Sequence, residues 1–434
     1  MTASEEGMPL VRSVTTAVFV FHDVRNRADG RPSFSWGGYR HMKWDYTQPV
    51  DIRFGSGRVA EIGEVAHERG LYRGLLVAGG HSVRSGLAQS VIDHGRGTIE
   101  AVFSEFSPNP DVTEVDACAE LIRTQDIGFI VALGGGSALD LAKAASVIGA
   151  GSREAVGSIT DYHGTGKPLP LTHLPLIAVP TTAGTGSEVT CVSVLTNRAV
   201  GVKAPIVSNG FYPELAIIDP ELTYTVPPYV TACTGMDVLS QAIEGYWSVG
   251  HQPICDALAV HAARLVFEFL PKAFTTPDDR EARERMCEAS VTAGLAFTLP
   301  KTTSSHACSF PLTNRYGIAH GEACALTLDY FTRINAADPE GRVNALARSL
   351  GYRDADGLAD AIADLRRTLG LRENIADLGL DESDIAALVR DSHHPNLDNN
   401  PVVITDDNLL DLYRGLASGG AANADKHNER EERQ

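Results

Sequence analysis

Residues 127–143 read IGFIVALGGGSALDLAK, and this stretch decides the fold. An apolar run ends in three glycines, Gly134, Gly135 and Gly136, and Ser137 then precedes apolar residues at helical spacing. Glycines let the backbone approach a diphosphate closely, and the free amides and positive end of a following helix attract its charge. The stretch therefore predicts a strand, a phosphate-binding turn and a helix, with an unliganded tight turn as the plainer alternative.

The same alternation of strands and helices surrounds this stretch. VDIRFG (50–55), GLLVAGG (74–80) and TIEAVFSEF (98–106) read as strands, and helical patterns separate them. Repeated strand, turn and helix units predict a parallel, doubly wound sheet that binds ligands at the carboxyl ends of its strands. Beyond about Asp219 and Pro220 long helical patterns take over. We therefore expect an α/β half followed by an all-helical half.

The chain divides into four segments by composition and pattern. We expect an N-terminal extension at 1–45, a dinucleotide-binding α/β domain at 46–220, a helical metal-binding domain at 221–420 and a polar tail at 421–434. The extension mixes glycine, arginine and aromatic residues without a sustained period, and the tail is polar with mixed charge, which is typical of frayed ends.

Charge and cysteine usage limit the possible partners and compartments. The 434 residues include 37 Lys and Arg against 55 Asp and Glu, a net charge of −18 that disfavours nucleic acid and anionic membranes. An anionic substrate would therefore need a locally basic pocket. The seven scattered cysteines contain no CxxC pair, which argues for reduced thiols rather than disulfides or a cysteine zinc site. The early apolar run is too short for a signal peptide, so we expect a cytoplasmic protein.

A second polar cluster follows an apolar run, as the glycines do. PTTAGTGSEVT (180–190) comes directly after PLIAV and contributes Thr181, Thr182, Thr185 and Ser187. Its hydroxyls and amides suit contacts to phosphate, ribose or a nicotinamide amide, whereas a plain polar loop is the alternative. Two such clusters at the ends of two expected strands favour nucleotide binding.

A third group of polar side chains lies in the helical half. TGMDVLSQAIEGYW carries Asp237 and Gln241 one turn apart on one helix face, and the segment from Lys301 onward carries His306 and His320. One carboxylate, one amide oxygen and two imidazoles can close around a divalent cation. The histidine spacing matches no short zinc signature, and a single histidine is more often a packed or surface residue.

At these three segments the chain resembles the iron-containing (group III) alcohol dehydrogenase family, from about Val50 to about Ala417. GGGSALDLAK, which includes Asp140, resembles the family's diphosphate loop, and PTTAGTGSEVT its nicotinamide loop. KAPIVS, which begins at Lys203, resembles an interdomain segment that contributes to the cofactor site. The resemblance implies a dinucleotide-binding domain, a helical domain, and a metal and substrate between them. The implied cofactors are Fe(2+), with Zn(2+) as an alternative, and NADH; we expect a homodimer.

The resemblance also places the metal ligands. The family's aspartate falls on Asp237, and two of its histidines fall on His306 and His320. The family usually has histidine one turn after the aspartate, where this chain has Gln241, and a further histidine is replaced by Phe310. An amide oxygen is a harder and weaker donor than an imidazole, which puts the affinity or identity of the metal in doubt.

One branch of the family is especially similar. QAIEGYWSV and KTTSSHACSFPLTNRYGIAHGEACAL resemble the phosphonoacetaldehyde reductases, which implies reduction of phosphonoacetaldehyde to 2-hydroxyethylphosphonate in phosphonate and antibiotic biosynthesis. Lys301 and Arg315 flank His306 in sequence and are the expected phosphonate-binding cations, unless they are ordinary surface residues. The alternatives are a family member acting on another small aldehyde or alcohol, a dehydroquinate-synthase-like cyclase, and an inactive metal-free nucleotide-binding homologue.

The choice between NADH and NADPH is expected to depend on Gly79. The family commonly has an acidic residue after the second strand, which binds the adenosine ribose and repels a 2′-phosphate. Aligning LLVAGGHSVRSG with that strand end places Gly79 at this position, with His81 and Arg84 nearby. We therefore expect NADH to be used and NADPH to be tolerated unusually well.

Overall fold

The structure is a computed structural model that describes residues 43–419. The expectations for residues 1–42 of the extension and for the tail from Ala421 lie outside the described residues. The strands are β1 (Asp51–Phe54), β2 (Gly74–Ala78), β3 (Ile99–Phe103), β4 (Phe129–Gly134), β5 (Leu176–Pro180), β6 (Val192–Asn197), β7 (Val202–Val207) and β8 (Leu215–Ile218). The helices of the first half are α1 (Ile62–Glu68), α2 (Gly80–Arg84), α3 (Leu87–His94), α4 (Val112–Thr124), α5 (Gly136–Ile148) and α6 (Arg153–Val156). Those of the second half are α7 (Pro228–Trp247), α8 (Pro253–Thr275), α9 (Arg280–Phe297), α10 (Ser304–Tyr316), α11 (His320–Ile334), α12 (Arg342–Ser349), α13 (Ala355–Thr368), α14 (Glu382–Asp391) and α15 (Asp406–Ala417).

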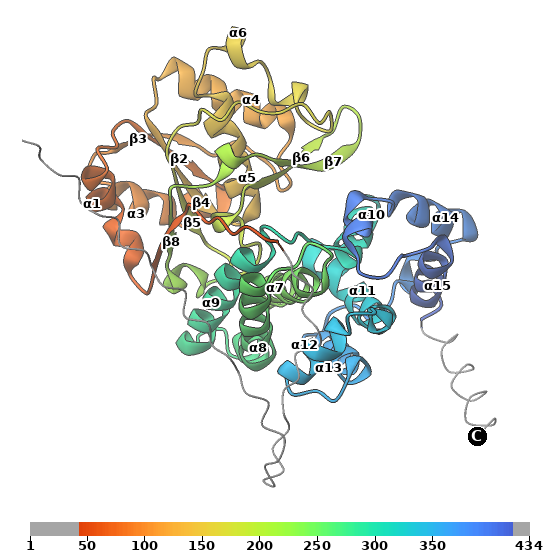
Figure 1. The fold of residues 1–434 in the computed structure, drawn as a ribbon. Coiled ribbons are helices and arrows are strands. Elements are labelled where there is room, and N and C mark those ends of the chain that lie inside the picture. Colours follow the sequence, from red (N-terminus) through yellow and green to blue (C-terminus); the bar gives the residue numbers. More distant parts are fainter. Residues whose placement is uncertain (1–42, 420–434) are drawn as a thin grey trace, which may run out of the picture. The chain divides into compact units, whose positions relative to one another are not determined.

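Six parallel strands form the main sheet, in the order β1-β8-β5-β4-β2-β3. The chain leaves β2 for β3 on one side, then returns to build β4, β5 and β8 on the other side (Figure 1). The topological switch point therefore lies between β2 and β4, where Ala78 pairs with Leu133. Because ligands of open α/β sheets bind at this point, the glycines after β2 and β4 stand at the expected edge. The predicted doubly wound sheet and helical second half are confirmed.

The central strands are apolar on both faces because helices cover both sides of the sheet. Leu75 and Val77 of β2 pack in a cluster with α4 and α5, whereas Leu76 and Ala78 pack with α1 and α3. Alternating residues thus enter opposite cores, as expected for a buried parallel strand.

An antiparallel hairpin of β6 and β7 was not predicted from the sequence. Its strands pair from Val192 opposite Val207 to Asn197 opposite Val202. β6 also packs on α5, and the hairpin positions Lys203 on β7. KAPIVS is therefore a strand rather than only a connecting segment.

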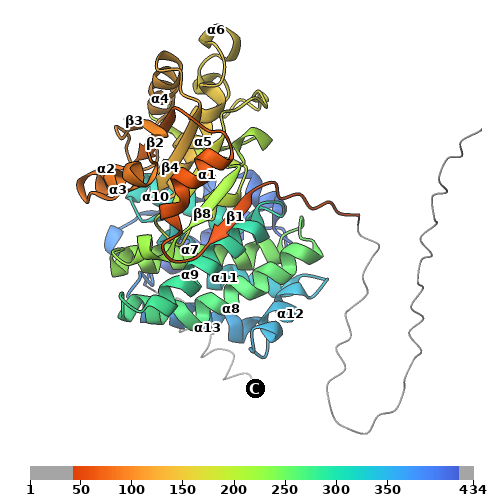
Figure 2. The same ribbon diagram turned by 90° about the vertical axis from the view of Figure 1, so that its left-hand side faces the viewer.

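The helical half packs around α7, most of whose residues are buried. α7 contacts α8, α9 and α11, and both views show α7, α8 and α9 lying together below β8 (Figures 1 and 2). A separate apolar cluster joins the two halves, because Cys287 and Val291 of α9 pack with Val189 and Ala216. Within residues 43–419, no helix is long and apolar enough to cross a membrane.

Candidate active site

The three glycines after β4 bring two loops into contact. Gly134 has φ of 156°, and a Cβ there would lie 2.7 Å from the Cβ of Ala138. A Cβ on Gly135 would meet Thr182, and one on Gly136 would crowd Thr185. Side chains at these positions would push the loop that begins at Thr181 away from the start of α5. Within the described residues no side chain caps the first turn of α5, so its amides are available to a diphosphate.

Asp140 and Ser187 fasten these two loops together. The carboxylate of Asp140 accepts hydrogen bonds from Ser187 Oγ at 2.7 Å and from Val194 N at 3.0 Å. Lys143 Nζ donates to Ser187 Oγ at 2.7 Å and to Thr190 Oγ1 at 3.1 Å. Burial lowers the pKa of Lys143 to about 8 and raises that of Asp140. Asp140 and Ser187, which were expected at the cofactor, are thus hydrogen-bonded within the protein and tie the two loops together.

A cavity of about 560 Å³ opens beside the switch point. Its size lies within the range of about 300–1,000 Å³ that small-molecule sites occupy. Thr181 and Thr182 line it together with residues of α2, α3 and the segment after β8, including His81, Ser82, Ser85, Glu221 and Leu222. Hydroxyls and an imidazole therefore surround the space beyond β2, where the adenosine end of a dinucleotide binds in such folds.

Gly79→Asp tests the expected cofactor preference. A Cβ at this position would meet only Phe106, at 3.8 Å, so the larger side chain fits. A carboxylate there would repel a 2′-phosphate, and we expect kcat/KM for NADPH to fall by roughly tenfold or more relative to NADH. Gly79→Asn is the uncharged control of the same size and should leave the ratio nearly unchanged. An aspartate variant with the wild-type ratio would show that position 79 does not discriminate.

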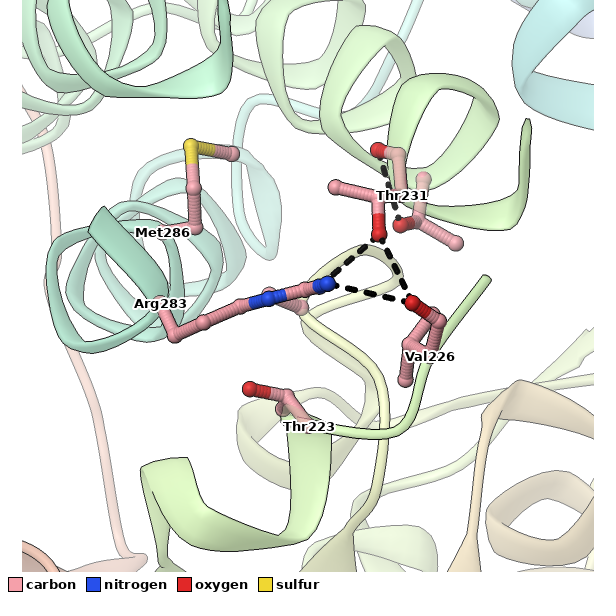
Figure 3. A pocket seen from close by; sticks show the side chains of 7 residues that line it. Thr223, Val226, Thr231, Arg283 and Met286 are labelled. Carbon is pink, nitrogen blue, oxygen red and sulfur yellow. Dashed lines mark hydrogen bonds between the residues drawn. The ribbon is translucent and has the colours of Figure 1, made fainter. Parts of the chain in front are cut away.

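Arg283 of α9 fixes the chain segment that leads from the sheet into α7. Its side chain is 3% exposed, and the guanidinium donates to Thr231 Oγ1 at 2.8 Å and to the carbonyl of Val226 at 3.0 Å (Figure 3). Burial lowers the pKa of Arg283. Val226 also lines the 560 Å³ cavity, so this arginine holds one wall of that cavity in place.

Three helices bring the expected metal ligands together. α7 carries Asp237 and Gln241, α10 carries His306, and His320 begins α11. Asp237 Oδ1 lies 3.4 Å from His306 Nε2 and 3.9 Å from His320 Nε2. Ligand atoms around a tetrahedral zinc ion are separated by similar distances when each bond is about 2.0–2.3 Å long.

Neighbouring side chains orient both imidazoles toward Asp237. Glu244 is fully buried and accepts a hydrogen bond from His306 Nδ1. It also accepts from Thr303 Oγ1 at 2.9 Å and from Ser305 N at 2.7 Å. Nδ1 of His320 lies 3.2 Å from Ser309 Oγ, whose own proton goes to the His306 carbonyl. Such contacts at Nδ1 leave both Nε2 atoms to face a cation.

The unpartnered acceptors at this site fit a cation. Asp237 Oδ1 and Gln241 Oε1 are buried oxygens without a hydrogen-bond donor among the described residues. Burial opposes protonation of His306, but Glu244 and Asp237 raise its pKa to about 10, whereas burial lowers the pKa of His320 to about 4. Carboxylate and imidazole donors suit Fe(2+) or Zn(2+).

Gly321 allows the two ligand-bearing helices to approach closely. A Cβ at this position would overlap the carbonyl oxygen of Cys233 on α7 and lie 3.1 Å from the Cβ of Asp237. His320 precedes this contact directly, so the backbone packing of α7 against α11 places its imidazole beside Asp237.

The sequence interpretation missed Glu244, the orienting role of Ser309, and Cys324. Glu244 follows Asp237 by two helical turns and therefore lies on the same helix face. This spacing could have placed Glu244 near the metal ligands from the sequence alone. Cys324 follows His320 by one turn, and its Sγ lies 3.9 Å from His320 Nε2. Phe310, where the family usually has histidine, stacks on His320 and contacts His394.

The three expected cations lie in different places. Arg315, at the far end of α10, forms an ion pair with Asp391 and is partly exposed. Lys301 has φ of 68° and donates to the carbonyl of Thr298 at 2.6 Å. Lys203 bonds Asn109 Oδ1 at 2.8 Å, and its charge acts on Asp140, Cys324 and Asp237. Lys203 therefore stands between the dinucleotide loops and the metal ligands.

Gln241→His tests whether the amide is a ligand. Its Nε2 lies 3.4 Å from the carbonyl oxygen of Thr185, and its Oε1 is unpartnered. If Oε1 binds the ion, imidazole should bind it more tightly, and we expect Kd for Zn(2+) to fall by roughly tenfold. Gln241→Leu should weaken binding by a similar factor. Unchanged affinity in both variants would place the amide outside the ligand set.

Both halves of the chain are similar to known proteins. Residues 49–220 match the iron-containing alcohol dehydrogenase family, and residues 231–417 match the C-terminal part of the Fe-containing alcohol dehydrogenase family. The solved structure of sulfoacetaldehyde reductase from Bifidobacterium kashiwanohense in complex with NAD+ is 64% identical, with a TM-score of 0.84, and the match covers 87% of this chain and 99% of that chain. NAD-dependent methanol dehydrogenase of Bacillus methanolicus is 32% identical over 85% of this chain and 98% of its own. The 1,3-propanediol dehydrogenase of Citrobacter freundii is 35% identical, and the match covers 79% of this chain and 91% of that protein.

The doubly wound sheet, the cavity at its switch point and the group of side chains that could hold a cation are consistent with a nicotinamide-linked, metal-type oxidoreductase. The chain belongs to the iron-containing alcohol dehydrogenase family. Its activity is therefore that of an NAD-linked alcohol or aldehyde dehydrogenase.

Proposed function

We propose that the protein reduces a two-carbon aldehyde bearing an anionic group, with sulfoacetaldehyde and phosphonoacetaldehyde as the two candidate substrates. The observation that carries this proposal is the 64% identity to a sulfoacetaldehyde reductase over 87% of the chain. Both aldehydes combine a reactive carbonyl with a tetrahedral anion, so they make similar demands on the site.

The charges near the site favour the sulfonate. A sulfonate carries one negative charge at neutral pH, whereas a phosphonate approaches two, as a phosphate ester does. Arg315 is neutralised by Asp391, which leaves Lys203 and Lys301 as the cations offered to the substrate. Asp391 thus removes one of the two cations, Lys301 and Arg315, that were expected to bind a phosphonate. Phosphonoacetaldehyde remains the second candidate because of the sequence resemblance around His306.

The chain's own residues hold and orient the reactants. Asp237, His306 and His320 would hold the metal ion, with Gln241 beside them. When bound, the ion supplies Lewis-acid polarisation of the aldehyde oxygen, and the nicotinamide supplies hydride. Glu244 and Ser309 keep the imidazoles aligned, which limits reorganisation during the reaction.

The proton that completes the alcohol must come from elsewhere. Phe310 has no proton to give, and the Ser309 hydroxyl is already committed to the carbonyl of His306. We propose that water, or a hydroxyl of the dinucleotide ribose, supplies this proton.

The deciding assay follows NADH oxidation by purified protein loaded with Fe(2+) or Zn(2+). We expect kcat/KM for sulfoacetaldehyde and phosphonoacetaldehyde to exceed that for propanal, with sulfoacetaldehyde the better of the two. Equal rates with propanal would reject an anionic substrate. Turnover of a sugar phosphate without net NADH consumption would instead indicate a cyclase.

Neutral replacements test the substrate-binding cations. We expect Lys301→Gln and Lys203→Gln to lower kcat/KM for the anionic aldehyde by tenfold to a hundredfold more than for propanal. A charge-assisted contact of about 1.5–3 kcal/mol gives this range. Arg315→Gln is the matched control, because its guanidinium already pairs with Asp391. A uniform loss on both substrates would mean that the lysines act only on the cofactor or the fold.

A further inference from the structure

A thiol lies within the group of expected metal ligands. Cys324 is fully buried on α11, one helical turn after His320 and on the same face. Its Sγ and ligand atoms of Asp237, His306 and His320 all lie within 4.8 Å of one another. In the described part of the chain, no other group of three or more histidine, cysteine or acidic side chains has this arrangement.

We propose that Cys324 is a protein ligand of the bound metal ion, which completes an Asp237, His306, His320 and Cys324 set. This inference rests on the proposed metal role of the other three residues. Three helices contribute to this set. α7 provides the carboxylate, α10 provides one imidazole, and α11 provides both the second imidazole and the thiolate.

The competing donor, Gln241, is less suited to the fourth position. Its Nε2 lies within hydrogen-bonding distance of the carbonyl of Thr185, which restrains the amide on the side of the nicotinamide loop. An amide oxygen is also a neutral donor, whereas a thiolate carries the charge that balances a divalent ion with one carboxylate. The loss of the family's histidine at position 241 is thus compensated from the neighbouring helix rather than by the amide.

The proposal has a chemical consequence for metal choice. Thiolate is a soft ligand that selects zinc over magnesium or manganese, and a mixed sulfur, nitrogen and oxygen set is typical of zinc. Binding releases the thiol proton to solvent, because the thiolate is the coordinating form. We therefore infer that this chain prefers Zn(2+) to the hard divalent cations.

X-ray absorption spectroscopy of the full-length zinc-loaded protein tests this ligand directly. We expect one sulfur scatterer at about 2.3 Å beside nitrogen and oxygen scatterers at about 2.0–2.2 Å. Cys324→Ala should lose the sulfur shell, and its Kd for Zn(2+) should rise by roughly tenfold or more, since even groups that only orient ligands change affinity 10–100-fold. Circular dichroism and the unfolding midpoint establish that the variant is folded.

Cys233→Ala is the matched control, because Cys233 is a buried cysteine on α7, one turn before Asp237, and lies outside the ligand group. It should retain the sulfur shell. Zinc bound by the wild type with only nitrogen and oxygen scatterers would overturn the assignment of Cys324 and leave the proposed function intact. A sulfur shell that survives Cys324→Ala would likewise overturn it. Failure of the wild type to bind any zinc or iron would reject the proposed metal site together with this ligand.

Discussion

Alanine in place of Asp237, His306 or His320 is expected to abolish tight metal binding and to lower turnover by more than about 100-fold. Each substitution removes one of three side chains whose ligand atoms lie within 4.8 Å of one another. Loss of groups that merely orient such ligands already costs about 10–100-fold in affinity or activity, so loss of a ligand should exceed that. Metal content and NADH-linked turnover are the measurements.

His320→Ala is the cleanest of the three variants, because His306→Ala also leaves the buried carboxylate of Glu244 without its imidazole partner. His261→Ala on α8 is the control, since that partly exposed histidine pairs with Glu288 outside the site. Full metal occupancy in all three site variants would reject the site.

The second large effect is expected for Glu244→Gln. The wild-type carboxylate accepts from Thr303 Oγ1, Ser305 N and His306 Nδ1 at a fully buried position. The amide would place an NH₂ group against one of these donors, so we expect a loss of about 3 kcal/mol in the free energy of unfolding. The misoriented imidazole should also weaken metal binding by about 10–100-fold.

Chemical denaturation of the metal-free protein separates these two effects, and titration with Zn(2+) measures the second. Glu288→Gln on α9 is the control, because its carboxylate is partly exposed and pairs with Arg285 and His261. That variant should change stability by no more than about 0.5 kcal/mol. If Glu244→Gln matches this control in both measurements, Glu244 does not orient His306.

The architecture could be predicted because its signals are local. The apolar run and glycines at 127–143 lie in one strand, turn and helix, and a strand ending in glycine has few alternative interpretations. The β6–β7 hairpin was missed because its strands are only partly apolar and its pairing depends on contacts with α5. The periodicity of apolar residues along the sequence does not reveal such tertiary contacts.

The sequence predicted only those site residues whose side-chain type by itself indicates metal binding. Asp237, His306 and His320 are ordinary ligand types, so they could be named before their distances were known. The contacts of Asp140 and Ser187 could not, because only the fold shows that Ser187 bonds both Asp140 and Lys143 of α5. Cys324 could not be recognised from its spacing, because it has no nearby cysteine in the sequence and its neighbour at the site is a histidine one turn earlier.

The contact between α7 and α11 at Gly321 makes the spacing of the ligands a property of the backbone. Asp237 and His320 lie on either side of this contact. The distance between them therefore cannot increase unless the buried helices α7 and α11 move apart. Such a rigid frame discriminates ions by radius. Ca²⁺ requires six to eight oxygen ligands at about 2.3–2.6 Å, which would force the helices apart, whereas the smaller transition-metal ions need no expansion. Calcium should therefore be a poor competitor for this site even at millimolar concentration.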